Sequence, residues 1–113
     1  MASLGMQGPF DLNSDSIDKH VIEISPGNYA LGYVLSNKFV VMRIGRSDSD
    51  INKKLHEWIW DKSHTMFKFS YAESAKAAFE KECQNFHDFQ PDENTDHPAR
   101  PDNTNWHCPV CGI

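Results

Sequence analysis

The sequence predicts a mixed α/β domain of the α+β type, with a small three-stranded, mainly antiparallel sheet flanked by helices. Two apolar stretches, 29–35 and 39–45, follow each other closely with the turn signal SNK between them. Apolar residues recur at helical spacing within 51–59 and again within 75–86. A chain of 113 residues has room for one such domain, so every motif must share one core.

Six elements are expected in the order helix, strand, strand, helix, strand, helix, over residues 14–20, 29–35, 39–45, 51–59, 66–70 and 73–87. The stretch 39–45 is an almost unbroken apolar run with β-branched residues, which is typical of a buried strand antiparallel to its predecessor. In the segment 51–59, Ile51, Leu55 and Trp58 fall on one face of a helix. This helix should therefore be amphipathic.

The expected domain organisation has three parts. Residues 1–10 are Gly-containing and small, and we expect them to be disordered. Residues 11–94 form the folded domain, whose last helix is expected to begin at a capping box made by Ser70 and Glu73. The remainder, 95–113, holds few apolar residues and should run as an irregular extension unless something ties it down.

Composition and charge narrow the function classes. The formal net charge of -5 argues against a protein that holds nucleic acid by its overall charge. Between residues 30 and 70, however, seven lysines and arginines stand against four acids, so a local basic surface is expected. No stretch approaches the roughly 20 apolar residues of a membrane span, and no basic region precedes an apolar run at the N-terminus. We therefore expect a soluble, intracellular protein, located in the cytoplasm and not in a membrane.

The cysteines and histidines predict a metal site. Three cysteines cannot all pair within the chain, and two of them form the motif CPVC near its end. In a reducing compartment such a pair indicates thiolate ligands more than a disulfide. Cys83 and His87 are four residues apart in the last predicted helix and therefore project from the same face. The expected ligands of a structural Zn²⁺ are Cys83, His87, Cys108 and Cys111.

This zinc site would tie the extension 95–113 to the helix, because four metal bonds can fix a segment that buries little apolar surface. Four protein ligands leave no open position, which favours a structural role over a catalytic one. His97 and His107 remain open as substitutes for His87. In the alternative interpretation, Cys83 is a small core residue, His87 lies on the surface and the CPVC thiols are free.

An ordered set of short motifs runs along the predicted elements. The triplets GNY and RIG lie at 27–29 and 43–45, on the two strands of the predicted hairpin. The residues that complete the order are Lys54, Glu82, Pro91 and Asn94. This order resembles the GIY-YIG nuclease superfamily over about Ile24 to Asn94. Arg43 stands where the family usually has tyrosine, and Lys54 stands where it has arginine, which keeps the charge but loses the planar fork.

The resemblance implies a metal-dependent endonuclease that hydrolyses phosphodiester bonds of nucleic acid, with DNA as the expected partner. The implied catalytic residues are Tyr29, Arg43, Arg46, Lys54, His56, Glu82 and Asn94. Glu82 would hold one Mg²⁺ or Mn²⁺ ion, because these ions prefer oxygen ligands. Tyr29 would act as the general base or orient water, and Lys54 or a nearby arginine would contact the scissile phosphate. His56 would relay a proton.

The alternative function is a catalytically impaired, zinc-stabilised module of the same fold that binds nucleic acid or a protein. The lost tyrosine of the second triplet, the lysine in place of arginine and the acidic net charge favour it. Convergence of Tyr29, Lys54 and Glu82 on one open cleft would favour the enzyme. A Glu82 buried in an ion pair would favour the binding module.

Overall fold

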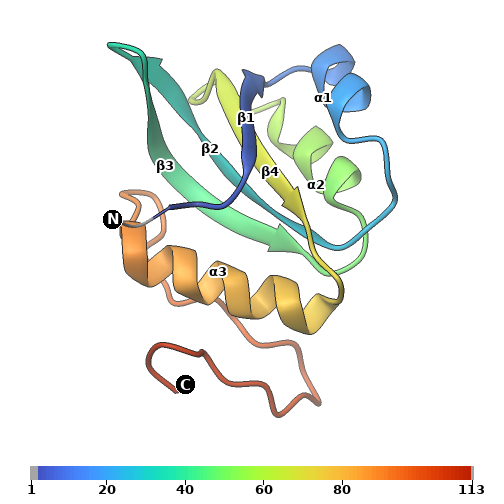
Figure 1. Ribbon diagram of the computed structural model, residues 1–113, viewed down its shortest axis with the longest axis vertical. Helices are drawn as coiled ribbons and strands as arrows, with labels where there is room; N and C mark the ends of the chain where they lie inside the picture. The colour runs from blue at the N-terminus through green and yellow to red at the C-terminus, as the bar shows by residue number, and fades with distance from the viewer. Residues whose placement is uncertain (1–2, 113) are drawn as a thin grey trace.

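The computed structural model describes residues 3–112, which form an α+β domain on a four-stranded antiparallel sheet (Figure 1). Its elements are β1 (Gln7–Asp11), α1 (Ser14–His20), β2 (Gly27–Leu35), β3 (Lys38–Ser47), α2 (Ile51–Trp58), β4 (Met66–Tyr71) and α3 (Ala75–Phe89). The strand order is β1-β4-β2-β3, and all three neighbouring pairs are antiparallel. The predicted fold class is confirmed, whereas the predicted count of three strands is wrong.

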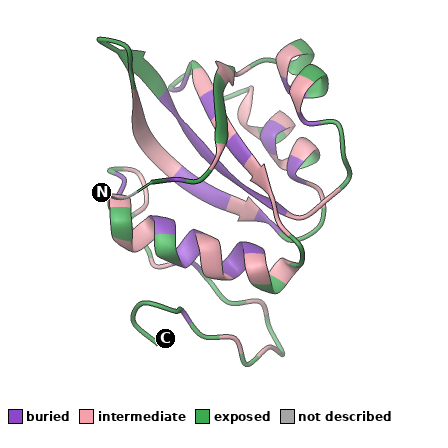
Figure 2. Ribbon diagram, viewed as in Figure 1, coloured by how far each residue is buried: buried purple, intermediate pink, exposed green. Residues whose placement is uncertain are grey.

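The β2–β3 hairpin is set by its turn. Ser36 and Asn37 both have positive φ angles, 51° and 65°, as in the two-residue turns whose twist suits antiparallel strands. Leu35 pairs with Lys38 across this turn, and the register continues to Gly27 opposite Ser47. The hairpin therefore runs nearly the full length of the sheet, and its tip is exposed (Figure 2).

The additional strand lies in the N-terminal segment that was expected to be disordered. Gln7 and Phe10 pair with Phe69 and Phe67 of β4, so β1 completes the edge of the sheet next to β4. The ring of Phe10 stacks on that of His20 at 3.8 Å, which fixes the strand against α1. Residues 1 and 2 of the expected disordered segment, and residue 113 of the extension, lie outside the described residues.

The alternation of β2 divides the core into two layers. Tyr29 and Leu31 face one side of the sheet, where they pack with residues of α1, α2 and β4. Ala30 faces the other side, where it packs with Ile44 and is covered by Phe86 of α3. Figure 1 accordingly shows α1 and α2 on one face of the sheet and α3 across the other. No helix within residues 3–112 is long and apolar enough to cross a lipid bilayer.

Helix α3 begins later than the expected capping box. Its N-cap is Ser74, whose side chain accepts a hydrogen bond from the N–H of Ala77. Ser70 instead belongs to β4, where its hydroxyl accepts a hydrogen bond from Lys81 Nζ at 2.8 Å. The box is wrong because β4 stays paired with β2 as far as Tyr71, opposite Gly27.

After α3 the chain first contacts the edge of β3 and then returns along α3. Glu93 donates its backbone N–H to the carbonyl of Met42 at 3.1 Å and so covers the free edge of β3. The C-terminal extension then runs along α3 (Figure 1). There Cys108 and Trp106 pack on Phe79 of the helix. The extension thus follows α3 without secondary structure of its own.

Candidate functional site

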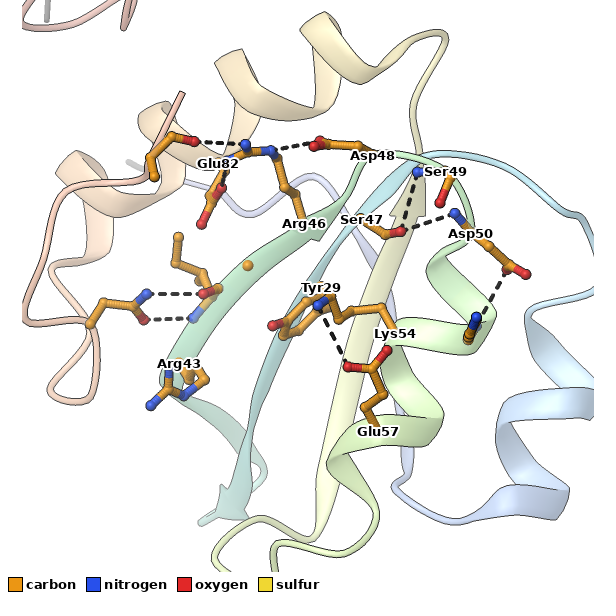
Figure 3. Close-up of a pocket in the computed structure, with 15 residues that line it drawn as sticks. Tyr29, Arg43, Arg46, Ser47, Asp48, Ser49, Asp50, Lys54, Glu57 and Glu82 are labelled. Carbon is orange, nitrogen blue, oxygen red and sulfur yellow. Dashed lines mark hydrogen bonds and ion pairs between the residues drawn. The ribbon is translucent and has the colours of Figure 1, made fainter. Parts of the chain in front are cut away.

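A cavity of about 500 Å³ lies at the Ser47 end of the β2–β3 hairpin, between the start of α2, the middle of α3 and the C-terminal extension (Figure 3). Six of the seven residues implied by the resemblance line it: Tyr29, Arg43, Arg46, Lys54, Glu82 and Asn94. They come from β2, β3, α2, α3 and the loop after α3. The cavity therefore gathers these six residues from positions up to 65 apart in the sequence.

The two triplets of the hairpin meet in this cavity. Tyr29 and Gly45 are partners in the β2–β3 register. A Cβ atom at Gly45 would lie 2.4 Å from both Cζ and Oη of Tyr29, so the ring lies directly over the bare backbone. Only glycine leaves this space free. The glycine of RIG thus serves to seat the tyrosine of GNY.

The hydroxyl of Tyr29 is buried and has one protein partner within residues 3–112. Trp58 Nε1 donates a hydrogen bond to Tyr29 Oη at 2.8 Å. Burial raises the pKa of Tyr29 to about 12, although the hydrogen bond from Trp58 favours the ionised form. Tyr29 is therefore a neutral phenol at physiological pH.

Arg46 and Glu82 form an ion pair at the wall of the cavity. Arg46 Nη1 donates to Glu82 Oε1 at 2.5 Å, and both side chains are nearly buried, with 12% and 11% exposure. The other guanidinium nitrogens of Arg46 donate to Asp48 Oδ1 and to the carbonyl of Ala99. Figure 3 shows Arg46 between these partners. All three nitrogens of Arg46 are thus used within the protein.

The electrostatics of this pair reflect burial and hydrogen bonding. Burial raises the pKa of Glu82, and the hydrogen bond from Arg46 only partly offsets it. Burial disfavours the charge of Arg46 as well, but its hydrogen bonds to Asp48 and Glu82 raise its pKa overall. Glu82 is consequently not an ordinary acid on the helix surface.

Lys54 and His56 diverge although they are two residues apart on α2. Lys54 lines the cavity, with Nζ 3.7 Å from Glu57 Oε1 and more than a third of its side chain exposed. His56 does not line it, because its Nε2 is 2.9 Å from Oδ1 of Asp18 in α1. Two positions on a helix differ by about 200°, so the two side chains leave in opposite directions. His56 thus lies outside the cavity that gathers the other six residues.

Asn94 is held by the backbone of β3. Its Oδ1 accepts from the N–H of Ile44 at 2.8 Å, and its Nδ2 donates to the carbonyl of Ile44 at 3.0 Å. Both ends of the amide are therefore engaged in tying the loop after α3 to the edge strand. Asn94 therefore shapes the cavity wall through its bonds to Ile44.

Arg43 belongs to a second polar network behind Tyr29. Its Nε donates to Glu93 Oε1 at 3.2 Å, and its guanidinium lies 4.7 Å from the ring centre of Trp58. Glu93 Oε2 is 2.8 Å from Nε2 of the buried His64. Sequence reasoning missed Trp58, His64 and Glu93, because apolar spacing marks Trp58 only as a core position and the other two lie in loops.

A separate group of side chains can hold a metal ion at the outer side of α3. Its members are His87, His97, Cys108 and Cys111, whose ligand atoms all lie within 4.8 Å of one another. Cys83 is not a member, so this group differs from the predicted Cys₃His set by one residue. Cys83 is fully buried beside Phe79 and Cys108, and burial raises the pKa of its thiol to about 12. It therefore stays a neutral core thiol.

The donor atoms of this group fit a bound cation. Nε2 of His87 is buried and has no hydrogen-bond partner within residues 3–112. The Nδ1–H of His97 donates to the carbonyl of Pro98 at 3.0 Å, which leaves its Nε2 unprotonated, 3.3 Å from Cys111 Sγ.

Cys108 is prepared for the same purpose. Burial opposes ionisation of its thiol, but hydrogen bonds from the backbone of Cys111 and Val110 lower its pKa to about 6. Two thiols and two imidazoles therefore lie close enough to share one cation, and the thiol of Cys108 already favours its ionised form. His97 replaces Cys83 in this set, whereas the sequence suggested it only as a substitute for His87.

Comparison of the chain with protein-family models, curated proteins and solved structures finds no match.

Proposed function

We propose that the protein is a metal-dependent endonuclease-like enzyme of the GIY-YIG type, which hydrolyses phosphodiester bonds of nucleic acid, with DNA as the expected substrate. One observation carries this proposal. Six of the seven residues implied by the ordered motifs line a single cavity, although they come from five different segments. The seating of Tyr29 on Gly45 adds a physical reason for the two triplets to occur together.

The cavity holds basic side chains that could contact a phosphodiester, beside four acids: Asp48, Asp50, Glu57 and Glu82. Lys53 and Lys54 enter from α2 and Arg43 enters from β3, all facing the same space. The only protein contact of the Lys54 ammonium within residues 3–112 is the long one to Glu57, so a phosphate oxygen can compete for it. Arg46 is less available, because its nitrogens are already bonded. We therefore assign phosphate contact to Lys54 and Arg43 and a structural role to Arg46.

Glu82 is the carboxylate that would hold Mg²⁺ or Mn²⁺. Only its Oε1 is bonded to Arg46, and Oε2 has no hydrogen bond within the described part of the chain. Mg²⁺ is commonly bound by one or two carboxylates together with substrate phosphate oxygens and water, so a single free oxygen fits this donor chemistry. When bound, the ion would activate water and stabilise the charge that develops on the phosphate.

The metal centre on α3 is proposed to hold structural Zn²⁺. Two sulfur and two imidazole ligands in a closed set suit tetrahedral zinc and leave no position for substrate. Zinc would fix the extension against α3, because the extension has no secondary structure of its own and contributes only Cys108 and Trp106 to the apolar cluster on Phe79. This role is separate from the chemistry proposed for the cavity.

A second candidate function is binding of nucleic acid without cleavage. The observation that favours it is the buried ion pair, because Arg46 neutralises the only carboxylate offered by α3 to the cavity. A cation would have to compete with this guanidinium for Glu82. The binding module would retain Lys53, Lys54 and Arg43 as phosphate contacts.

The test is incubation of the purified protein with plasmid and single-stranded DNA in Mg²⁺ or Mn²⁺. Glu82→Gln should abolish cleavage, whereas Glu73→Gln, an exposed acid just before α3, should leave it unchanged. Binding of DNA without cleavage by the native protein would support the second candidate. Absence of both binding and cleavage would reject the two functions together.

A further inference from the structure

Trp58 controls the direction of the hydrogen bonds that Tyr29 can make. The indole N–H donates and cannot accept, so Tyr29 Oη must be the acceptor in the 2.8 Å contact between them. The phenolic proton therefore has to point elsewhere. Within residues 3–112 the hydroxyl makes no other hydrogen bond, and Tyr29 lines the cavity.

The indole itself is held from two sides. The guanidinium of Arg43 lies over its ring, and His64 meets it edge-on at 6.2 Å between ring centres. Glu93 bonds both of these residues, one with each carboxylate oxygen. Glu93 is in turn attached to β3 through its backbone. Because its neighbours are tied together, Trp58 cannot rotate without breaking this network.

We propose that Trp58 is a positioning residue, which fixes the Tyr29 hydroxyl as a hydrogen-bond donor to an anionic oxygen of the phosphodiester bound in the cavity. This inference rests on the proposed function, since it requires an anionic ligand in that cavity. It differs from the roles implied by the resemblance, in which Tyr29 acts on water, either as a general base or by orienting it. A residue that gives a hydrogen bond to phosphate orients the substrate and does not activate water.

The surroundings of Tyr29 keep its hydroxyl protonated, as a hydrogen-bond donor requires. Glu82 of α3, Arg43 of β3 and Glu57 of α2 are the charged groups that face it, and burial is the largest cause of its pKa of about 12. At pH 7 the phenolate would be present in roughly one molecule in 10⁵. A hydrogen bond from the neutral phenol to a phosphate oxygen needs no such rare state.

The experiment measures the Kd of a fluorescently labelled single-stranded DNA oligonucleotide at pH 7, without added Mg²⁺ or Mn²⁺, so that binding is separated from cleavage. The variants are Tyr29→Phe, Trp58→Phe, the double variant and Lys54→Gln. Phe at position 58 keeps a ring beneath Arg43 but lacks the N–H. Trp60→Phe is the matched control, because Trp60 is 81% exposed.

Tyr29→Phe should weaken binding by about 10-fold or more, because a hydrogen bond to a charged group is lost. Trp58→Phe should weaken it by roughly 3- to 10-fold, and the double variant should bind no more weakly than Tyr29→Phe alone. Trp60→Phe should bind like the native protein. A merely structural Trp58 would instead give losses that add to those of Tyr29→Phe. If Trp58→Phe does not unfold cooperatively, Trp58→His is measured as well; because it restores a ring N–H, the positioning role predicts that it binds more tightly than Trp58→Phe, and equal weakening would overturn that role.

Two failures can be told apart. If Lys54→Gln weakens binding while Trp58→Phe leaves it unchanged, or the two aromatic losses add, the role of Trp58 is overturned and the proposed function stands. If neither Lys54→Gln nor Tyr29→Phe affects the Kd, the oligonucleotide does not occupy the cavity and the proposed function fails as well. A loss in Trp60→Phe equal to that in Trp58→Phe would also overturn the positioning role.

Discussion

Substituting Tyr29 by phenylalanine should make the stability of the protein less sensitive to alkaline pH. The pKa of Tyr29 is raised from 10 to about 12 in the folded protein, chiefly because the phenol is buried. The folded state therefore holds this proton more tightly than the unfolded state. Its contribution to stability is complete below pH 10 and is lost as pH rises towards 12. Two units correspond to about 3 kcal/mol of unfolding free energy.

The assay is urea denaturation followed by circular dichroism at several pH values from 9 to 12. The quantity of interest is the unfolding free energy of the native protein minus that of Tyr29→Phe, which should fall by about 2 kcal/mol over this range, because the full loss is reached only above pH 12. Lys81, whose pKa is lowered by burial, changes stability in the opposite sense, but it is common to both proteins and cancels. Tyr33→Phe, which removes a more exposed phenol, is the matched control. A constant difference across the range would refute the assignment of Tyr29 as a buried neutral donor.

Three further changes test other contacts. Gly45→Ala should cost about 1–3 kcal/mol in urea denaturation, because the new Cβ would lie 2.4 Å from Tyr29 Oη, and Tyr29→Ala in the same chain should relieve this loss. Cys83→Ala should leave about one zinc per chain by elemental analysis, whereas His97→Ala should lower the metal content. A loss of zinc in Cys83→Ala with none in His97→Ala would restore the Cys₃His set. Arg46→Met should lower the unfolding free energy by about 3–5 kcal/mol, since it leaves a buried carboxylate unpaired, and a loss below 1 kcal/mol would show that the pair is effectively solvated.

Local patterns predicted the parts of the fold that are set by neighbouring residues. The hairpin 27–47 and the amphipathic helix α2 follow from apolar runs, turn residues and helical spacing that lie within each segment. Strand β1 was missed because its sequence QGPFD carries glycine and proline, and its partner β4 lies some 60 residues away. The start of α3 was misplaced because Ser70 and Ser74 are equally good caps, and only the pairing of β4 with β2 selects between them.

In the candidate sites too, local spacing predicts some features, whereas others depend on how distant segments pack. Helical spacing placed Cys83 and His87 on one face of α3, and both do lie beside the metal centre. Helical spacing cannot show whether Cys83 or His87 contributes a ligand atom. That depends on the path of the irregular extension, which here brings His97 into the group in place of Cys83. Local spacing could not predict the hydrogen bond from Arg46 to Glu82 either, because it joins β3 to α3 across 36 positions of the sequence. Such pairs depend on the packing of whole elements.

The cavity and the metal centre are also less separate than the faces of α3 suggest. Glu82 lies on the side of α3 that meets the cavity, whereas His87 lies on the side that meets the extension. Ala99 nevertheless lines the cavity, and its carbonyl accepts a hydrogen bond from Arg46 at 2.7 Å. Ala99 follows His97 by only two residues, so a metal ion held by His97 would also restrict where this carbonyl can lie. The extension is therefore part of the cavity wall, and the orientation of Arg46 depends on its docking.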